Sequence, residues 1–80
     1  MGGRVRKRRE PTTASHVVRR AMEAIDMSPM TFETIGEMSG IHHNAISIWR
    51  HGKSSPSVYL LDSVLNVVGY RLTVERISED

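Results

Sequence analysis

Residues 32–51 read FETIGEMSGIHHNAISIWRH, and this stretch decides the fold. Gly36 and Gly40 stand four positions apart, and apolar residues recur at helical spacing on both sides of Gly40. Two helices that cross steeply through a short turn need a small residue at the crossing and a permissive backbone in the turn. Gly36 and Gly40 meet these two needs. The stretch therefore predicts two short helices, over residues 32–39 and 42–51, joined by a tight turn.

The helix predicted over residues 42–51 has two different faces. Its spacing directs Ile46 and Trp49 inward, where both side chains are expected to pack in the core. The remaining positions carry mostly polar side chains and are predicted to point outward: His42, His43, Asn44, Ser47 and Ile48. This helix therefore presents a polar face to whatever the protein binds.

The flanking sequence predicts two further helices. One extends over residues 14–27, with a threonine of the preceding Pro11-Thr12-Thr13 as its cap and Pro29 beyond its end. The other extends over residues 58–68, with Ser57 as its cap, and Thr31 is the expected cap of the helix over residues 32–39. Apolar residues at these spacings, and the methionines, are expected in the core or at its corners: Val17, Val18, Ala21, Met22, Ala24, Ile25, Met27, Met30, Phe32, Ile35, Met38, Val58, Leu61, Val64, Leu65 and Val68.

The two ends of the chain differ from the helical part. Residues 1–10 contain five basic residues and almost no apolar side chains, so we expect a disordered basic arm. After Gly69 the period changes to two, as Tyr70, Leu72 and Val74 alternate with polar residues, which predicts a half-buried strand over residues 70–77. The expected division is an arm over 1–10, a helical domain over 11–69, and a strand and tail over 70–80.

The charge of the chain is distributed unevenly. Residues 1–20 carry seven Lys and Arg against one acidic residue, whereas residues 21–80 carry four against eight. A basic arm on a mildly acidic body indicates that the arm holds a polyanion. The chain has no cysteine, which excludes disulfides and thiolate metal sites. No apolar run approaches the ~20 residues that span a bilayer, and no secretory signal follows the basic start; we expect a cytoplasmic protein, associated with the nucleoid, without a membrane partner.

Residues 14–69 resemble the helix-turn-helix domain of the phage-repressor superfamily, of the Cro or Xre type. The resemblance includes the two helices around Gly40, the loop from Gly52 to Ser57 and the apolar helix that follows it. It implies a four-helix, lambda-repressor-like, mainly all-α fold. Gly36 stands where the family usually has alanine, which costs roughly 1 kcal/mol of helix stability, and Phe32 stands where it often has glutamine.

The resemblance also implies roles for individual residues. The helix over 42–51 would lie in the major groove of DNA, with its outward residues at the base edges: His42, His43, Asn44, Ser47 and Ile48. The positions that match phosphate contacts are Thr31, Arg50, Lys53, Ser54 and Ser55. In addition, arginines favour a narrow minor groove, so the arm is expected to wrap the duplex through its basic residues: Arg4, Arg6, Lys7, Arg8 and Arg9.

Neither a metal site nor catalysis is expected. His43 and His51 are about two helical turns apart, too far to share an ion, and the chain has no known zinc spacing of Cys and His. Ser, His and Asp occur, but nothing arranges them as nucleophile and base, and a chain of 80 residues leaves little room for a substrate cleft. We expect no cofactor.

A single strand cannot satisfy its own backbone, so the strand over residues 70–77 needs a partner. Pairing with a second copy through Tyr70, Leu72 and Val74 would form a homodimer; the alternative is a strand that folds back on its own helices. The leading hypothesis is therefore a dimeric repressor or autoregulator that reads an inverted repeat in double-stranded DNA. The alternatives are an antitoxin or phage or mobile-element accessory protein that mainly binds a protein such as a toxin, and nonspecific nucleic-acid binding through the arm.

Overall fold

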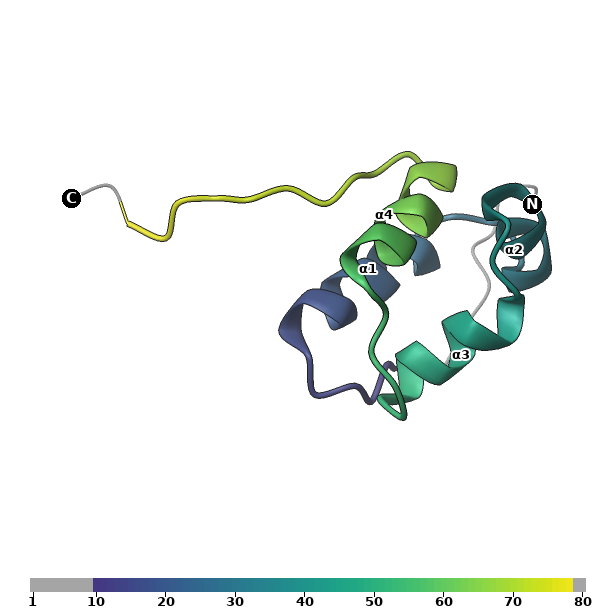
Figure 1. Cartoon of the computed structure of the whole chain (residues 1–80), viewed down its shortest axis with the longest axis horizontal. Coiled ribbons are helices and arrows are strands. Elements are labelled where there is room, and N and C mark those ends of the chain that lie inside the picture. Colours follow the sequence, from purple (N-terminus) through teal and green to yellow (C-terminus); the bar gives the residue numbers. More distant parts are fainter. Residues whose placement is uncertain (1–9, 79–80) are drawn as a thin grey trace.

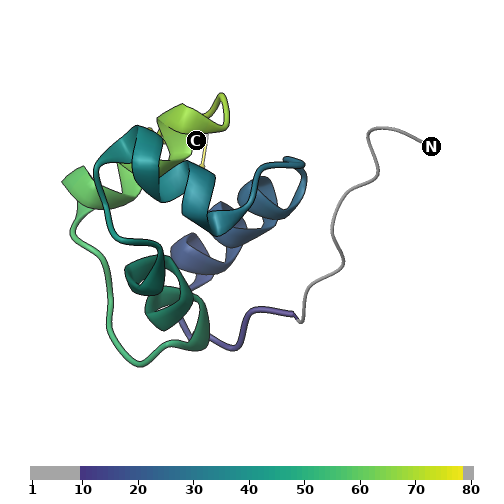
Figure 2. The same cartoon turned by 90° about the vertical axis from the view of Figure 1, so that its right-hand side faces the viewer.

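The structure is a computed structural model of the chain and describes residues 10–78. It contains four helices, α1 (His16–Asp26), α2 (Phe32–Ser39), α3 (His43–His51) and α4 (Val58–Val67), and no strand occurs in the described residues. The prediction of a mainly all-α fold is confirmed. Helices α1 and α2 each pack against both α3 and α4 (Figures 1 and 2), and the C-terminal segment leaves this bundle on the side away from α3 (Figure 1).

Side-chain caps define where the helices begin. Thr31 caps α2 by accepting a hydrogen bond from the Thr34 amide, and Ser57 caps α4 in the same way, as predicted. The cap of α1 is Ser15, which accepts from the Val18 amide, so the prediction of a threonine cap was wrong. The threonine hydroxyl is used differently, because Thr13 Oγ1 accepts from the Ser15 amide and closes a turn before the helix begins.

The core lies between the four helices and is filled by one stripe from each. Its buried members are all apolar: Val18, Ala21, Met22, Ile25, Ile35, Ile46, Trp49, Leu61, Val64 and Leu65. Four residues expected in the core are exposed instead, namely Val17, Met27, Met38 and Val58. Their helical spacing fits a wide apolar stripe, but a bundle of this size covers only the centre of each stripe. Val17 and Met27 line a surface groove beside α1.

The turn between α2 and α3 has the backbone that the two glycines predict. Gly40 adopts a left-handed conformation with φ of 80°, and its amide donates to the Gly36 carbonyl at 2.8 Å. At the crossing, a Cβ on Gly36 would lie 2.6 Å from the Ile41 carbonyl oxygen and 3.1 Å from the His43 amide nitrogen. A glycine fits this position because the start of α3 lies directly against α2.

The C-terminal segment is attached to α4 by three polar contacts and one apolar side chain. The Tyr70 amide donates to the Leu65 carbonyl, and the Leu72 amide donates to the Asp62 carboxylate at 2.8 Å. Asn66 Nδ2 donates to the Tyr70 carbonyl, and the side chain of Leu72 packs against the core. Beyond this point the segment is exposed, and residues 70–77 pair with no other strand in the described part of the chain. No helix within residues 10–78 combines the length and the hydropathy that a membrane span requires.

Candidate nucleic-acid interface

Helix α3 is divided into a buried side and an exposed side. Ile46 is completely buried and Trp49 nearly so, which holds the helix against the core. The side chains expected to face outward do so to different degrees, because His42, Asn44 and Ile48 are exposed whereas His43 and Ser47 are half-buried. The exposed side of α3 therefore carries an imidazole, a carboxamide and an aliphatic group together. These are groups that can read the edges of bases.

His42 begins α3 as its cap. Its Nδ1 accepts a hydrogen bond of 3.1 Å from the Asn44 amide, so Nδ1 carries no proton in this arrangement. The neutral ring then carries its proton on Nε2 and presents a donor. The ring also stacks on His43, with 4.5 Å between the ring centres. The two imidazoles are therefore held by local contacts at the start of the helix, where exposed amides favour an acceptor or an anion.

The polar groups predicted to contact phosphates lie on both sides of α3. Lys53, Ser54 and Ser55 are exposed in the loop that follows α3. This loop begins at Gly52, which has a φ of 78° and ends the helix in a left-handed conformation. Thr31 is half-buried, and its hydroxyl both caps α2 and donates to Thr34 Oγ1 at 3.0 Å. The three loop residues are free to reach a ligand, whereas the hydroxyl of Thr31 already has partners.

Arg50 has a structural role, which corrects its assignment to the phosphate contacts. Its guanidinium forms a two-pronged ion pair with Asp26 at the end of α1, with distances of 3.0 Å from Nη1 to Oδ1 and 2.7 Å from Nη2 to Oδ2. The Arg50 side chain is only 6% exposed. Removing this cation from Asp26 would leave a half-buried carboxylate without its main partner. The ion pair is therefore expected to remain intact between α3 and the end of α1.

The chain before α1 is anchored to the end of α3. The amides of Thr12 and Thr13 both donate to the Arg50 carbonyl, at 3.0 and 3.1 Å, and the Thr12 hydroxyl donates to the His51 carbonyl. These bonds satisfy carbonyls that a helix end leaves without partners. The predicted arm contacts fall on residues 1–9, outside the described residues, but their point of attachment lies beside α3.

Three functional details were missed from the sequence. Asp26, Thr12 and Thr13 were not connected with α3, although they fix Arg50 and the root of the arm. No local pattern links Asp26 to a residue 24 positions away. The helical spacing of α3 did contain a signal for the burial of Arg50. This residue follows Trp49 and lies four positions after Ile46, on the edge of the helix that faces the core.

Histidines are numerous here but do not assemble into a metal site. Within residues 10–78 no three His, Asp or Glu side chains are grouped closely enough to hold an ion. His51 Nδ1 lies 3.0 Å from the Ser47 carbonyl and donates to it, so this ring is held along its own helix. The start of α3 also adjoins a shallow groove with Glu33 and Glu37 of α2. Those carboxylates repel phosphates, so positive charge must come from elsewhere.

Comparisons with known proteins leave this geometry to be interpreted by itself. The sequence matches no protein-family model and no curated protein, and the structure matches no solved structure.

Proposed function

We propose that the protein binds double-stranded DNA in a sequence-specific manner and regulates transcription, with α3 in the major groove. One observation carries this proposal: α3 is fixed to the core by Ile46 and Trp49 while its other side exposes His42, Asn44 and Ile48. A helix of this width fits the major groove, and these side chains match base chemistry. Asparagine can bond adenine with two hydrogen bonds, and isoleucine can pack on a thymine methyl. The resemblance to the Cro and Xre helix-turn-helix family supports the same placement.

The positive charge for this interaction comes mainly from the arm. Arg50 is withdrawn into its ion pair with Asp26, which leaves Lys53 as the exposed cation next to α3 within the described residues. The five basic residues of positions 4–9 follow a root that is hydrogen-bonded to the end of α3. An arm attached there can reach the phosphates or the minor groove next to the helix. Deleting residues 2–9 should therefore remove most of the salt dependence of binding.

The test is selection of bound duplexes from a random pool, followed by titration with single-base variants. Asn44→Ala should cost about 1–3 kcal/mol at one base pair and little elsewhere, because it removes one base contact. Lys53→Ala should weaken all duplexes equally and lower the slope of log K against log[salt] by about 1. Ser63→Ala is the matched control, because the Ser63 hydroxyl donates to the Tyr59 carbonyl within α4.

Three outcomes would contradict the proposal or part of it. If no sequence is enriched, or if Asn44→Ala weakens every duplex to the same extent, α3 does not read bases. Unchanged affinity and salt slope after deletion of residues 2–9 would remove the role of the arm.

We also propose that the regulator is a homodimer joined by its C-terminal segments, so that two copies of α3 read an inverted repeat. Val74 is 96% exposed in the single chain and Tyr70 is 51% exposed, in a segment with alternating apolar residues. Val74→Asp should produce folded monomers that bind the repeat weakly, because Val74 has no core contact to lose. Leu72→Asp is less selective, since Leu72 also packs against its own core.

A further inference from the structure

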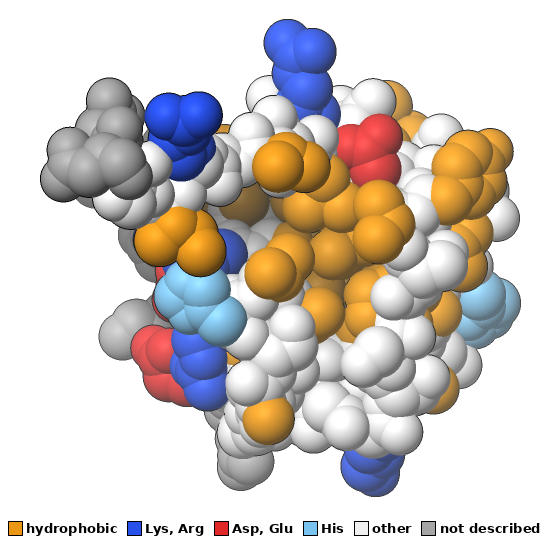
Figure 3. Space-filling view, turned by 60° about the vertical axis from the view of Figure 1, so that its left-hand side comes forward, with side chains coloured by type: hydrophobic (Ala, Val, Ile, Leu, Met, Phe, Trp, Pro, Cys, Tyr) orange, Lys and Arg blue, Asp and Glu red, His pale blue; other side chains and the backbone are white. Residues whose placement is uncertain are grey.

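A groove of about 700 Å³, lined by apolar and polar side chains together, lies between α1 and residues 70–75. Figure 3 shows hydrophobic side chains gathered around a hollow on the face from which the C-terminal segment leaves the body. The apolar lining comes from α1, α4 and the segment itself: Val17, Ala21, Ala24, Met27, Leu65, Tyr70 and Leu72. Val17 is 56% exposed and Met27 70% exposed, so the groove leaves apolar surface in water. Polar side chains line the same groove, so an occupant needs both apolar contacts and polar partners there: His16, Arg20, Glu23, Arg71, Thr73 and Glu75.

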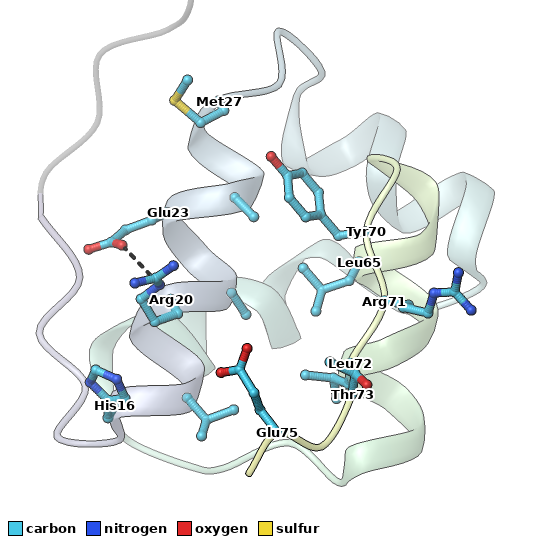
Figure 4. Close-up of a pocket in the computed structure, with 13 residues that line it drawn as sticks. His16, Arg20, Glu23, Met27, Leu65, Tyr70, Arg71, Leu72, Thr73 and Glu75 are labelled. Atoms are coloured by element: carbon cyan, nitrogen blue, oxygen red, sulfur yellow. Dashed lines mark ion pairs between the residues drawn. The ribbon is translucent and has the colours of Figure 1, made fainter. Parts of the chain in front are cut away.

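The segment beside the groove uses only one edge of its backbone. The Tyr70 amide and carbonyl and the Leu72 amide all bond to α4, through Leu65, Asn66 and Asp62. Alternate residues of an extended chain direct their amides and carbonyls to opposite edges. The backbone groups of residues 71, 73 and 75 therefore face the other edge, and nothing in residues 10–78 hydrogen-bonds to them. Figure 4 shows the groove between this segment and α1.

We propose that this groove receives the same segment of a second copy of the chain, as an antiparallel strand centred on Thr73. The inference rests on the proposed homodimer and specifies its interface. A strand placed in the groove lies beside the open edge, over Val17 and Ala24, and the two-fold axis repeats the arrangement in the second copy. Val74 lies outside the groove of its own chain. In the dimer, the groove of the partner subunit covers this side chain. The open backbone edge and the alternating apolar residues of the segment therefore identify the same segment of a second copy as the occupant.

Charge and apolar pattern together select the register. With Thr73 opposite Thr73 of the partner subunit, Arg71 lies opposite the partner's Glu75, and the symmetric pair forms as well. On the inner face Leu72 then lies opposite the partner's Val74, which joins the apolar residues across the strands. The neighbouring symmetric registers, centred on Leu72 or Val74, place Arg71 opposite a threonine or an isoleucine. Only the register centred on Thr73 forms two ion pairs.

Disulfide trapping tests the register in the full-length chain, which contains no cysteine of its own. Opposite residues in a hydrogen-bonded antiparallel pair have Cα atoms about 5.5 Å apart, a distance that a disulfide spans. Thr73→Cys should therefore form a linked dimer under mild oxidation, more efficiently than Leu72→Cys or Val74→Cys. A mixture of Arg71→Cys and Glu75→Cys chains should form the mixed dimer. Ser54→Cys, in the loop after α3, measures linkage by random collision.

Charge reversal tests the same pairing without cysteine. Arg71→Glu and Glu75→Arg should each raise the dimer dissociation constant roughly tenfold, because two attractive pairs become repulsive. The double variant should restore the original value, as measured by sedimentation equilibrium without DNA. Preferential linkage at residue 72 or 74, or no rescue in the double variant, would overturn the register. A monomeric wild-type chain that still selects DNA would overturn this interface and leave the DNA-binding proposal standing, whereas a dimer that selects no DNA would do the reverse.

Discussion

The exposed face of α3 and the groove beside α1 differ in the chemistry that they leave in water. Both helices bury one apolar stripe in the same core, through Ile46 and Trp49 in α3 and through Met22 and Ile25 in α1. Outside that stripe α3 presents imidazole and carboxamide groups, whereas α1 contributes Val17 and Ala24 to a groove that its polar side chains also line. A polar face keeps its hydration until a ligand with matching donors and acceptors replaces it. Covering the apolar part of the groove removes apolar surface from water, which is favourable in free energy by itself.

This difference is the reason that we propose DNA as the ligand of one face and protein as the ligand of the other. Major-groove recognition needs hydrogen-bonding groups on a rigid support, and the buried side of α3 supplies the rigidity. A strand-pairing interface needs an apolar floor and an open backbone edge, which the groove and residues 71–75 supply. Substitutions on the two faces separate what each residue contributes to folding from what it contributes to binding.

The largest difference is expected between the two isoleucines of α3. Ile46→Ala should lower the free energy of unfolding by about 3–4 kcal/mol, because it leaves a cavity in a completely buried position. Ile48 is 41% exposed two residues later, and Ile48→Ala should change stability by no more than about 0.5 kcal/mol. Denaturant titration at a fixed chain concentration measures both. Similar losses in the two variants would show that α3 has no separate outer face.

The next effect concerns the basic residues at the end of α3. Arg50→Ala should lower the free energy of unfolding by about 2–3 kcal/mol, near the low end for a broken buried pair because Asp26 remains 26% exposed. Lys53→Ala should leave stability unchanged. Thermal or denaturant unfolding distinguishes the two. If Arg50→Ala were as stable as the wild type and instead lowered the salt slope of DNA binding, the guanidinium would belong to the interface.

Substitution of Gly36 is expected to change stability less, because a gain in helix propensity opposes a loss from overpacking. Gly36→Ala gains about 1 kcal/mol of helix propensity, but its Cβ would lie 2.6 Å from a backbone carbonyl oxygen, and such overpacking costs about 1–3 kcal/mol. We expect a net loss of about 1 kcal/mol and a displaced start of α3, so that DNA affinity falls further than stability. Gly40→Ala is the control for backbone strain alone, since no atom lies within 4 Å of its Cβ position. A more stable Gly36→Ala variant would contradict the close crossing.

Most of the helical fold follows from local signals that the sequence displays. Phe32–Ser39 has the predicted bounds, because Thr31 and Gly40 define its ends through contacts within four residues. One error is local, since Ser15 and not a threonine caps α1, but the error that affects the candidate site concerns residues far apart in the chain. Arg50 occupies a position that the family resemblance links to phosphate, and only its partner 24 residues earlier assigns it to the body.

The C-terminal segment shows a second limit. Its alternation predicts a strand, but a strand exists only when another strand pairs with it, and the single chain provides none within the described residues. Asp62 and Asn66, which hold the segment against α4, gave no signal beyond their spacing of four on one helix. The candidate site was easier to predict than the interface, because one helix carries most of it.

The smallest effect on folding is expected at Val17, and it separates the groove from ordinary exposed apolar residues. Val17 lines the groove and is 56% exposed, whereas Val58, at the start of α4, is 74% exposed and lies outside the groove. Val17→Ser and Val58→Ser should each change the free energy of monomer unfolding by less than about 0.5 kcal/mol. Only Val17→Ser should weaken the dimer, by about 1 kcal/mol per protomer, since it removes apolar surface that the partner strand covers. Sedimentation equilibrium of the two variants decides the matter: equal dissociation constants would mean that the exposed valine of α1 has no more to do with association than the exposed valine of α4.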